Sequence, residues 1–470
     1  MSRFPFKFPN RPFSRAPRRM GSYGSSYGRR SKPKSIPLLW ILGAIPVGLV
    51  GLELLLRVGL GMTGRSADLA GFGGEPAVVS AYRLSPSLRD GQAIAGLPPG
   101  SLKVRSSALM GYELVPNQTS AAFSVNAQGF RDTETIESKK VSGEIRVLLL
   151  GGSSAFGTLS SSEDQTIAHQ LEAQLNQQVQ AQKANPNQFR PDVLPYFADE
   201  MDKVLKLPPK IRSGQYRVIN AAVPGYLTSN TLSQLSTKLL DYQPDVVVLI
   251  DGYSDLLVPS DREAATLGEV EKSLINPAGH FFGSLGQGIC DLWNQLYLVK
   301  TANAWLFKPN PQSELLADVS SSSGSIVDRF SADGKEIQAR IDRRTQALDK
   351  ISQLTRARKV PLIVGIAPEI SQRQKPEPPE SDILSRLGDR YPKLIQAQSN
   401  QLLEAQKKLS GITPVDLQSA VAEIKQTKPA NAFVDAVHLT GAANGAIAQK
   451  LVRTIAPLLY VEPKPFQGEQ

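Results

Sequence analysis

Residues 145–157 read IRVLLLGGSSAFG, an apolar run followed at once by two glycines and two serines. A continuous apolar run of this length predicts a strand that is buried on both faces, which is typical of a parallel sheet covered by helices. Two adjacent glycines allow a tight turn at the end of such a strand. The stretch therefore predicts a buried parallel strand whose carboxyl end carries an exposed serine hydroxyl.

The same alternation of elements continues along the chain. Further apolar runs of strand length lie at 217–222, 245–250, 360–366 and, more weakly, 412–417, and helical patterns lie at 165–182, 229–242, 337–358 and 441–459. Apolar strands that alternate with amphipathic helices predict a doubly wound, flavodoxin-like α/β domain. We place this domain at 141–460, with insertions at 183–213 and 257–330, the second long enough to form a cap.

Reactive residue types follow the predicted strands. Ser153 comes after the first strand, Gly225 after the second and Ser254 after the third, while Asp435 and His438 come directly before the last helical segment. In a parallel α/β sheet the ligands bind at the carboxyl ends of the strands, so these residues are expected on one rim. A serine, an imidazole and a carboxylate on one rim are the components of a nucleophilic triad.

The order of these blocks resembles the SGNH/GDSL hydrolase superfamily, and in particular its membrane-anchored bacterial members. The block G-D-S-x-x-x-G matches residues 151–157, with Gly152 in place of Asp, and the block G-x-N-D matches residues 252–255, with Ser254 in place of Asn. The second-block glycine matches Gly225, and the block D-x-x-H matches Asp435 and His438. Upstream, NAQGFRD at 126–132 is similar to a stretch that precedes the first block in membrane-anchored members.

The resemblance implies a catalytic triad. Ser153 would attack an acyl carbonyl, His438 would take the serine proton and return it to the leaving alcohol, and Asp435 would fix the imidazole tautomer. The backbone N–H groups of Ser153 and Gly225 and the side chain of Ser254 would form the oxyanion hole.

Position 254 leaves an alternative open for the third oxyanion donor. A serine hydroxyl is a shorter donor than an asparagine amide, so Asn220 or Asn230 could take its place. Two nearby carboxylates, Asp251 and Asp255, are interpreted as capping groups or acceptors at a strand end.

Charge and composition exclude several classes of function. The formal charge is +10, but residues 1–35 hold ten basic and no acidic side chains, so the remaining chain is neutral. A neutral chain after residue 35 lacks the basic face that phosphate contacts require, and we therefore expect no nucleic-acid partner. One cysteine excludes an internal disulfide, and the presence of only three histidines argues against a multi-histidine metal centre. We expect neither a metal nor a cofactor.

The N-terminal part predicts a membrane anchor. Residues 36–56 read IPLLWILGAIPVGLVGLELLL, close to the length of about 20 apolar residues that spans a bilayer, and we place the span at 36–58. The basic, disordered tail at 1–35 would remain in the cytoplasm, so the protein would be a single-pass membrane protein with its catalytic domain in the periplasm or outside the cell. A cleaved signal peptide is the alternative. Residues 63–140 would form a stalk and packing segment.

These features together predict a membrane-anchored extracytoplasmic serine esterase. Its expected substrate is an O-acyl or O-acetyl ester on a surface glycan or lipid. Two alternatives remain open: an O-acyltransferase that uses the same triad, and a non-catalytic envelope-binding protein on a degenerate SGNH fold. The sequence does not predict an oligomeric state.

Overall fold

The computed structural model describes Leu52, Leu55 and residues 81–82, 84–87, 102–107, 110–261, 326–376, 378–422, 424 and 431–466. The chain divides into two units, Met1–Leu55 and Leu56–Gln470, and the second contains all the elements discussed here. The predicted tail lies outside the described residues, as does the predicted span apart from Leu52 and Leu55, which are helical and exposed. None of the described helices is both long and apolar enough to cross a bilayer.

A five-stranded parallel sheet forms the centre of the second unit. Its strands are β6 (Glu144–Gly151), β7 (Gln215–Asn220), β8 (Val246–Asp251), β9 (Leu362–Ile366) and β10 (Thr413–Val415), in the order β10-β9-β8-β6-β7. The predicted parallel sheet is thus confirmed. The direction of the strand order reverses between β6 and β8, and in doubly wound sheets a ligand binds at such a switch point.

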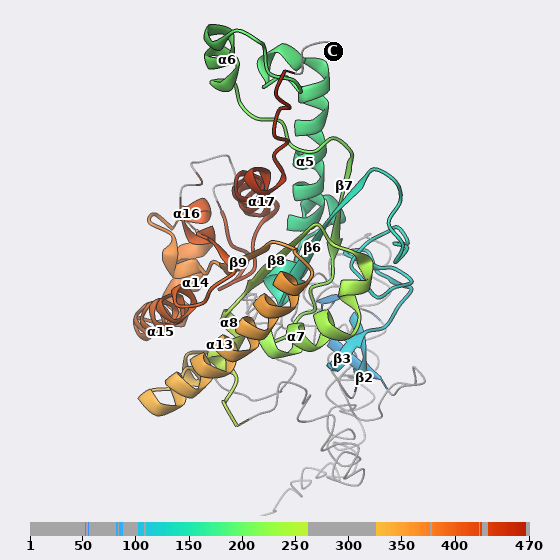
Figure 1. The fold of residues 1–470 in the computed structure, drawn as a ribbon. Helices are drawn as coiled ribbons and strands as arrows, with labels where there is room; N and C mark the ends of the chain where they lie inside the picture. The colour runs from blue at the N-terminus through green and yellow to red at the C-terminus, as the bar shows by residue number, and fades with distance from the viewer. Residues whose placement is uncertain are drawn as a thin grey trace, which may run out of the picture. The chain divides into compact units, whose positions relative to one another are not determined.

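Helices cover both faces of this sheet (Figure 1). Leu149 of β6 faces α5 (Ile167–Ala184) and α17 (Gly441–Ile455), and the neighbouring Leu148 belongs to the separate apolar cluster that includes α7 (Thr228–Thr237) and α13 (Gly334–Ala357). Successive side chains of a strand point to opposite faces, so a strand buried on both faces must be apolar throughout. The doubly wound arrangement is therefore confirmed.

Further helices lie outside the ranges that the sequence predicted. They are α4 (Ser153–Phe156), α8 (Tyr253–Leu257), α12 (Ile326–Arg329), α14 (Glu380–Leu387), α15 (Arg390–Lys407) and α16 (Leu417–Ala422). The longest, α15, is rich in glutamine, and its buried stripe includes Tyr391, Ile395 and Leu402. Short 3-10 turns also occur at η1 (Glu163–Gln165), η2 (Pro186–Gln188), η3 (Leu239–Tyr242), η4 (Ile370–Gln372) and η5 (Ala456–Leu459).

A second, smaller sheet lies within the segment that was predicted to be a stalk and packing region. Its strands are β1 (Leu84–Ser87), β2 (Leu102–Ser107) and β3 (Gly111–Leu114), followed by the separate pair β4 (Gln118–Thr119) and β5 (Ser124–Val125). Buried side chains of this sheet, such as Leu102 and Val104, join the same apolar cluster as α5 and α17. This part of the segment therefore packs on the α/β domain.

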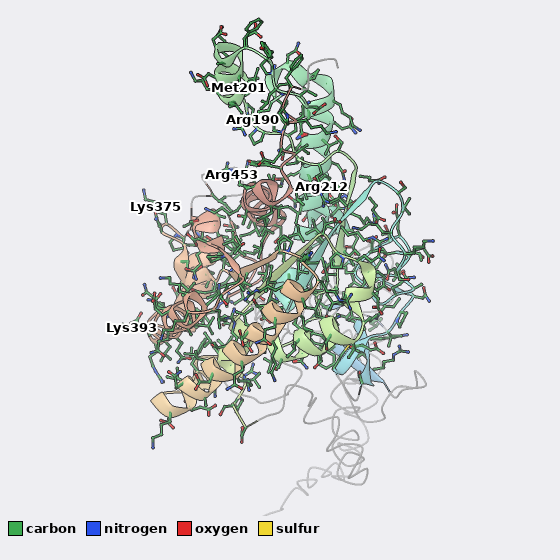
Figure 2. The ribbon with its side chains drawn as sticks, viewed as in Figure 1. Arg190, Met201, Arg212, Lys375, Lys393 and Arg453 are labelled. Carbon is green, nitrogen blue, oxygen red and sulfur yellow. The ribbon has the colours of Figure 1, made fainter. Side chains whose placement is uncertain are left out.

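The first predicted insertion, 183–213, contains α6 (Ala198–Leu205), none of whose residues is buried. Isolated β-bridges tie the insertion to the C-terminal segment, Val193 to Lys464 and Ile211 to Tyr460. Figure 2 shows Arg190 and Met201 of the insertion beyond the end of the sheet. Most of the second insertion, 262–325, lies outside the described residues, so its role as a cap stays a prediction.

Candidate active site

The loop that carries the predicted nucleophile begins at Gly151, the last residue of β6. A Cβ atom at this position would lie 1.9 Å from the carbonyl oxygen of Ile250, so only glycine allows β6 and β8 to approach this closely. Gly152 then caps α4, and Ser153 is the first residue of that helix. Ser153 is 6% exposed, and its hydroxyl forms no hydrogen bond with any described residue.

The loop before α17 holds a buried acid–imidazole pair. Asp435 Oδ1 accepts the backbone N–H groups of Val437 and His438, at 2.9 and 2.7 Å, and Asp435 Oδ2 lies 2.6 Å from His438 Nδ1. Because the carboxylate can only accept, Nδ1 carries the shared proton and Nε2 is left as the basic nitrogen. His438 Nε2 is buried and has no hydrogen-bond partner among the described residues.

Asp435 is held in its charged form. Burial by itself would raise the pKa of Asp435, but the charge of His438 and the hydrogen bonds to the carboxylate outweigh burial and lower it. An ionised carboxylate beside Nδ1 stabilises the imidazolium that forms when Nε2 takes up a proton.

The two loops are in contact through Ser154. Its hydroxyl donates a hydrogen bond of 3.2 Å to the carbonyl oxygen of Val437, the residue before His438. The predicted hydrogen bond from Ser153 to His438 is not formed, since His438 Nε2 has no partner in the described part of the chain. Catalytic hydrogen bonds of this kind are often long until the substrate binds. The structure thus contains the Asp435–His438 pair, and the complete triad remains a prediction.

Two backbone donors and one hydroxyl are available for an oxyanion. Neither the Ser153 N–H nor the Gly225 N–H donates a hydrogen bond to another described residue. Gly225 follows β7 with a φ of 83°, a conformation that favours glycine. Ser254 Oγ borders the same loop, because a Cβ atom built on Gly152 would lie 3.6 Å from it.

The two asparagines that could replace Ser254 are engaged elsewhere. Asn220 donates from its amide to the carbonyl oxygen of Phe156, and Asn230 donates to that of Met110. Their amide oxygens also accept, from the N–H groups of Ala222 and Leu227. Both amides thus already serve backbone groups in the described structure, and their use as the third oxyanion donor stays a prediction.

Residues from the N-terminal sheet brace the Gly225 loop. Tyr112 of β3 donates its hydroxyl to the carbonyl oxygen of Pro224, and Tyr226 donates its own hydroxyl to the carbonyl oxygen of Tyr112. Both rings are buried and pack edge to face, with centroids 5.2 Å apart. The loop that presents the Gly225 N–H is thus fixed on both sides.

Arg131, from the stretch at 126–132, braces the nucleophile loop. Its guanidinium is buried and donates to the carbonyl oxygens of Phe156 and Gly157, at 3.1 and 2.7 Å. It also donates to Glu163, at 2.9 Å, and to the hydroxyl of Tyr82, at 2.8 Å. The sequence pattern drew attention to this stretch but not to this role, which depends on contacts far along the chain.

A second cluster of buried charges lies at the end of β8. Asp251 accepts the N–H of Gly252 at 2.8 Å, and Asp255 accepts the hydroxyl of Thr228 at 2.7 Å. Arg344 of α13 lies near both, with its Nε 3.8 Å from Asp255 Oδ2. The interpretation of these two aspartates as plain acceptors is incomplete, because Asp251 Oδ2 is buried with no partner among the described residues.

Within the described ranges, no group of three or more His, Cys, Asp or Glu side chains could hold a metal ion. The described site contains a buried acid–imidazole pair on one loop and, on a second loop joined to it through Ser154, a serine hydroxyl without a hydrogen-bond partner among the described residues.

Comparisons with known proteins add only distant similarities. No protein-family model and no curated protein matches the chain. Among solved structures, 41 chains match. An acetyl xylan esterase is 12% identical over 66% of this chain and 100% of its own, with a TM-score of 0.29. A GDSL-like lipase from Bacteroides thetaiotaomicron is 13% identical over 67% of this chain and 89% of its own, with a TM-score of 0.30.

A third match is a catalytic mutant of an acetylxylan esterase from Geobacillus stearothermophilus. It is 13% identical over 66% of this chain and 94% of its own, with a TM-score of 0.31. TM-scores near 0.3 support no conclusion on fold or activity. Both therefore rest on the strand order and the site geometry of this chain.

Proposed function

We propose that the chain is a serine hydrolase of the SGNH type that cleaves an ester, with Ser153, His438 and Asp435 as its catalytic residues. The observation that carries the proposal is the buried Asp435–His438 pair, whose basic Nε2 has no partner among the described residues. The neighbouring loop carries Ser153, a serine whose hydroxyl forms no hydrogen bond there, and is tied to the histidine loop through Ser154.

The reaction would proceed in two steps. Ser153 Oγ attacks the ester carbonyl while His438 Nε2 takes its proton, and the tetrahedral intermediate then expels the alcohol, which leaves with that proton. Water, activated by the same nitrogen, releases the acid and restores Ser153. Throughout, Asp435 holds the imidazole in one tautomer and balances its positive charge.

The negative oxygen of the intermediate would lie against three donors, the N–H groups of Ser153 and Gly225 and the hydroxyl of Ser254. Removing a single donor of this kind typically costs a factor of about 10²–10³ in rate. Since Ser254 is the weakest of the three, a modest turnover is expected.

The substrate class and the location are part of the proposal. We propose an O-acyl or O-acetyl ester on a surface glycan or lipid, because the predicted span at 36–58 would export the catalytic domain. Washing membranes with alkaline carbonate tests the anchor, and a phosphatase fused after residue 470 tests the orientation. Full release of the chain by the wash would contradict anchoring, and an inactive fusion would contradict export.

The activity is tested with p-nitrophenyl acetate and with a fluorophosphonate probe, both on the full-length chain. We expect hydrolysis of the ester and labelling that peptide mapping assigns to Ser153. Ser153→Ala should abolish both, and His438→Ala should lower both by several orders of magnitude.

Ser162→Ala is the matched control, because Ser162 lies in the same connection to α5 and its side chain makes no cap hydrogen bond. This variant should keep the wild-type rate. If Ser153→Ala hydrolyses the ester as fast as the wild type, the proposed nucleophile is wrong.

Two related functions give different results in the same experiments. A non-catalytic envelope-binding protein is favoured by the absence of a Ser153–His438 hydrogen bond in the described structure, and it would leave Ser153 unlabelled. An O-acyltransferase would be labelled equally well but, given a sugar acceptor, would form an acylated sugar rather than free acid alone.

A further inference from the structure

Asp251 is a buried carboxyl that the proposed reaction does not use. It is the last residue of β8 and is 3% exposed. Its Oδ1 accepts the N–H of Gly252, at 2.8 Å, and its Oδ2 has no partner among the described residues. A buried polar atom without a partner is costly, so its retention calls for an explanation.

This carboxyl borders the proposed oxyanion hole. A Cβ atom built on Gly152 would lie 3.8 Å from Asp251 Oδ1, 3.6 Å from Ser254 Oγ and 3.5 Å from the carbonyl oxygen of Tyr226. The space beside residue 152 is thus lined by the carboxyl of Asp251 and the hydroxyl of Ser254. In the family block, a carboxylate stands at position 152 itself, so in this chain a carboxyl reaches that space from the neighbouring strand.

The same Asp251 also fixes the backbone that leads to Ser254. Gly252 has a φ of 116°, and the hydrogen bond from its N–H to Asp251 Oδ1 holds it there. Gly252 caps α8, whose second residue is Ser254. The orientation of the Asp251 side chain is therefore coupled to the position of the Ser254 hydroxyl.

Burial and a neighbouring carboxylate favour the neutral form of Asp251. The Asp255 carboxylate on α8 acts on Asp251, and so does the cation Arg344 on α13, while Arg344 and Arg343 both act on Asp255. Arg344 Nε is 3.8 Å from Asp255 Oδ2, and Thr228 of α7 donates to the same oxygen. Burial, and after it the Asp255 carboxylate, raises the pKa of Asp251 well above its ordinary value of 3.8.

We propose that Asp251 is a positioning residue of the oxyanion hole, which acts as a neutral carboxylic acid and holds Ser254 against the loop of Ser153. This inference rests on the proposed hydrolase function. A negative charge at Asp251 would oppose the developing oxyanion, whereas a neutral acid leaves the hole electrostatically favourable. A neutral acid also keeps the hydrogen bond to Gly252 and supplies a hydroxyl that can donate.

The test compares Asp251→Asn with Asp251→Ala in the full-length chain. Asparagine is neutral, has the same shape and keeps both an acceptor and a donor, so kcat near neutral pH should stay within about threefold of the wild type. Alanine removes the support of Ser254 and should lower kcat by about 10–100-fold with little change in KM, because the donor acts mainly in the transition state.

The dependence of kcat on pH distinguishes a positioning role of Asp251 from a purely structural one. The wild type should lose kcat at alkaline pH as Asp251 ionises, and Asp251→Asn should lack that loss. Asp245→Asn is the matched control, since Asp245 lies at the opposite end of β8, where it pairs with Lys140 and Arg212. The control should keep the wild-type pH profile. An Asp251→Asn enzyme as slow as Asp251→Ala, or an Asp251→Ala enzyme as fast as the wild type, overturns the proposal.

A direct measurement of protonation does not depend on turnover. The infrared difference spectrum between the wild type and Asp251→Asn at pH 7 should show the band of a protonated carboxyl group, and a carboxylate band in its place overturns the inference. If the wild type neither hydrolyses the ester nor labels at Ser153, the proposed function fails instead, whatever the spectrum shows. Melting curves of each variant confirm that it is folded.

Discussion

Asp435 and Asp251 are both fully buried aspartates on the rim of the same sheet, yet their surroundings favour the ionised form of the first and the neutral form of the second. Asp435 accepts two backbone N–H groups and the imidazole N–H of His438, and its pKa is lowered. Asp251 accepts one backbone N–H, faces a second carboxylate, and has a raised pKa. The difference shows that burial alone does not set the charge of a carboxyl, because the number of donors and the sign of the neighbour decide it.

This contrast assigns separate roles to the two loops. Pairs of titratable groups whose environments move their pKa values apart often divide the tasks of an active site. The loop before α17 would supply a permanent negative charge behind the base. The loop after β8 would supply a neutral support beside the developing oxyanion.

The largest loss of activity is expected when Asp435 is replaced. Asp435→Asn replaces an acceptor by an amide that can donate to Nδ1, which would place the imidazole proton on Nε2 and remove the base. We expect kcat for p-nitrophenyl acetate to fall by about 10⁴, as in other triads. Asp241→Asn, at an exposed aspartate in η3, is the control and should be unaffected. A loss smaller than tenfold would mean that the charge of Asp435 is not needed.

Arg131 is a buried cation, and replacing it is expected to cause the second largest effect, a loss of folding stability. Arg131→Met keeps an unbranched apolar chain but removes the guanidinium. Five acceptors then lose their donor: the carbonyl oxygens of Phe156, Gly157 and Ala122, the carboxylate of Glu163 and the hydroxyl of Tyr82. We expect unfolding free energy to fall by about 3 kcal/mol, measured by urea denaturation, because buried acceptors lose their donor.

A matched control for Arg131 is Arg105→Met, since Arg105 pairs with a single carboxylate, Glu113, and is partly exposed. Its effect should stay below about 1 kcal/mol. Equal losses for the two variants would show that Arg131 does not brace the nucleophile loop in particular.

The sequence predicted the elements that depend on local pattern. The apolar run of β6 and the chain order of Ser153, Gly225 and His438 were enough to predict a parallel sheet with reactive residues on one rim. The roles of Arg131 and Asp251 were not predicted, because they arise from contacts with residues far away in the chain, Phe156 for the first and Arg344 for the second. The strands β1, β2 and β3 were not predicted, because β1 and β3 are only four residues long and β2 carries Lys103, Arg105 and two serines in place of an apolar run.

Ser254→Asn tests the role of the loop after β8, and its expected effect on kcat is smaller. Asparagine restores the longer amide donor of the family block, and Ser254 is 9% exposed beside a residue without a side chain, Gly152. We expect kcat to rise by up to about tenfold with KM little changed, because a better oxyanion donor acts mainly in the transition state. A fall in kcat together with a lower melting temperature would mean that the space beside Gly152 cannot hold the amide.

The smallest effects are expected in thermal stability, where the two aspartates should respond with opposite signs. The folded-state pKa of Asp251 is raised above 3.8, so the group costs stability only above that pH, where the unfolded chain is ionised. The folded-state pKa of Asp435 is lowered, so its contribution is present above pH 3.8 and is lost as the pH falls through the folded value. At pH 7.5, Asp251→Asn should therefore raise the melting temperature by about 1 °C and Asp435→Asn should lower it by about as much, each corresponding to roughly 1 kcal/mol in a unit of this size. The Asp251 difference should shrink as the pH approaches 4, because the unfolded carboxyl then becomes protonated as the folded one already is. The Asp435 difference should persist at pH 4, because the folded carboxyl is still ionised there. Melting curves of the three proteins between pH 4 and pH 8 measure this, and shifts of the same sign at pH 7.5 would show that the two carboxyls carry the same charge.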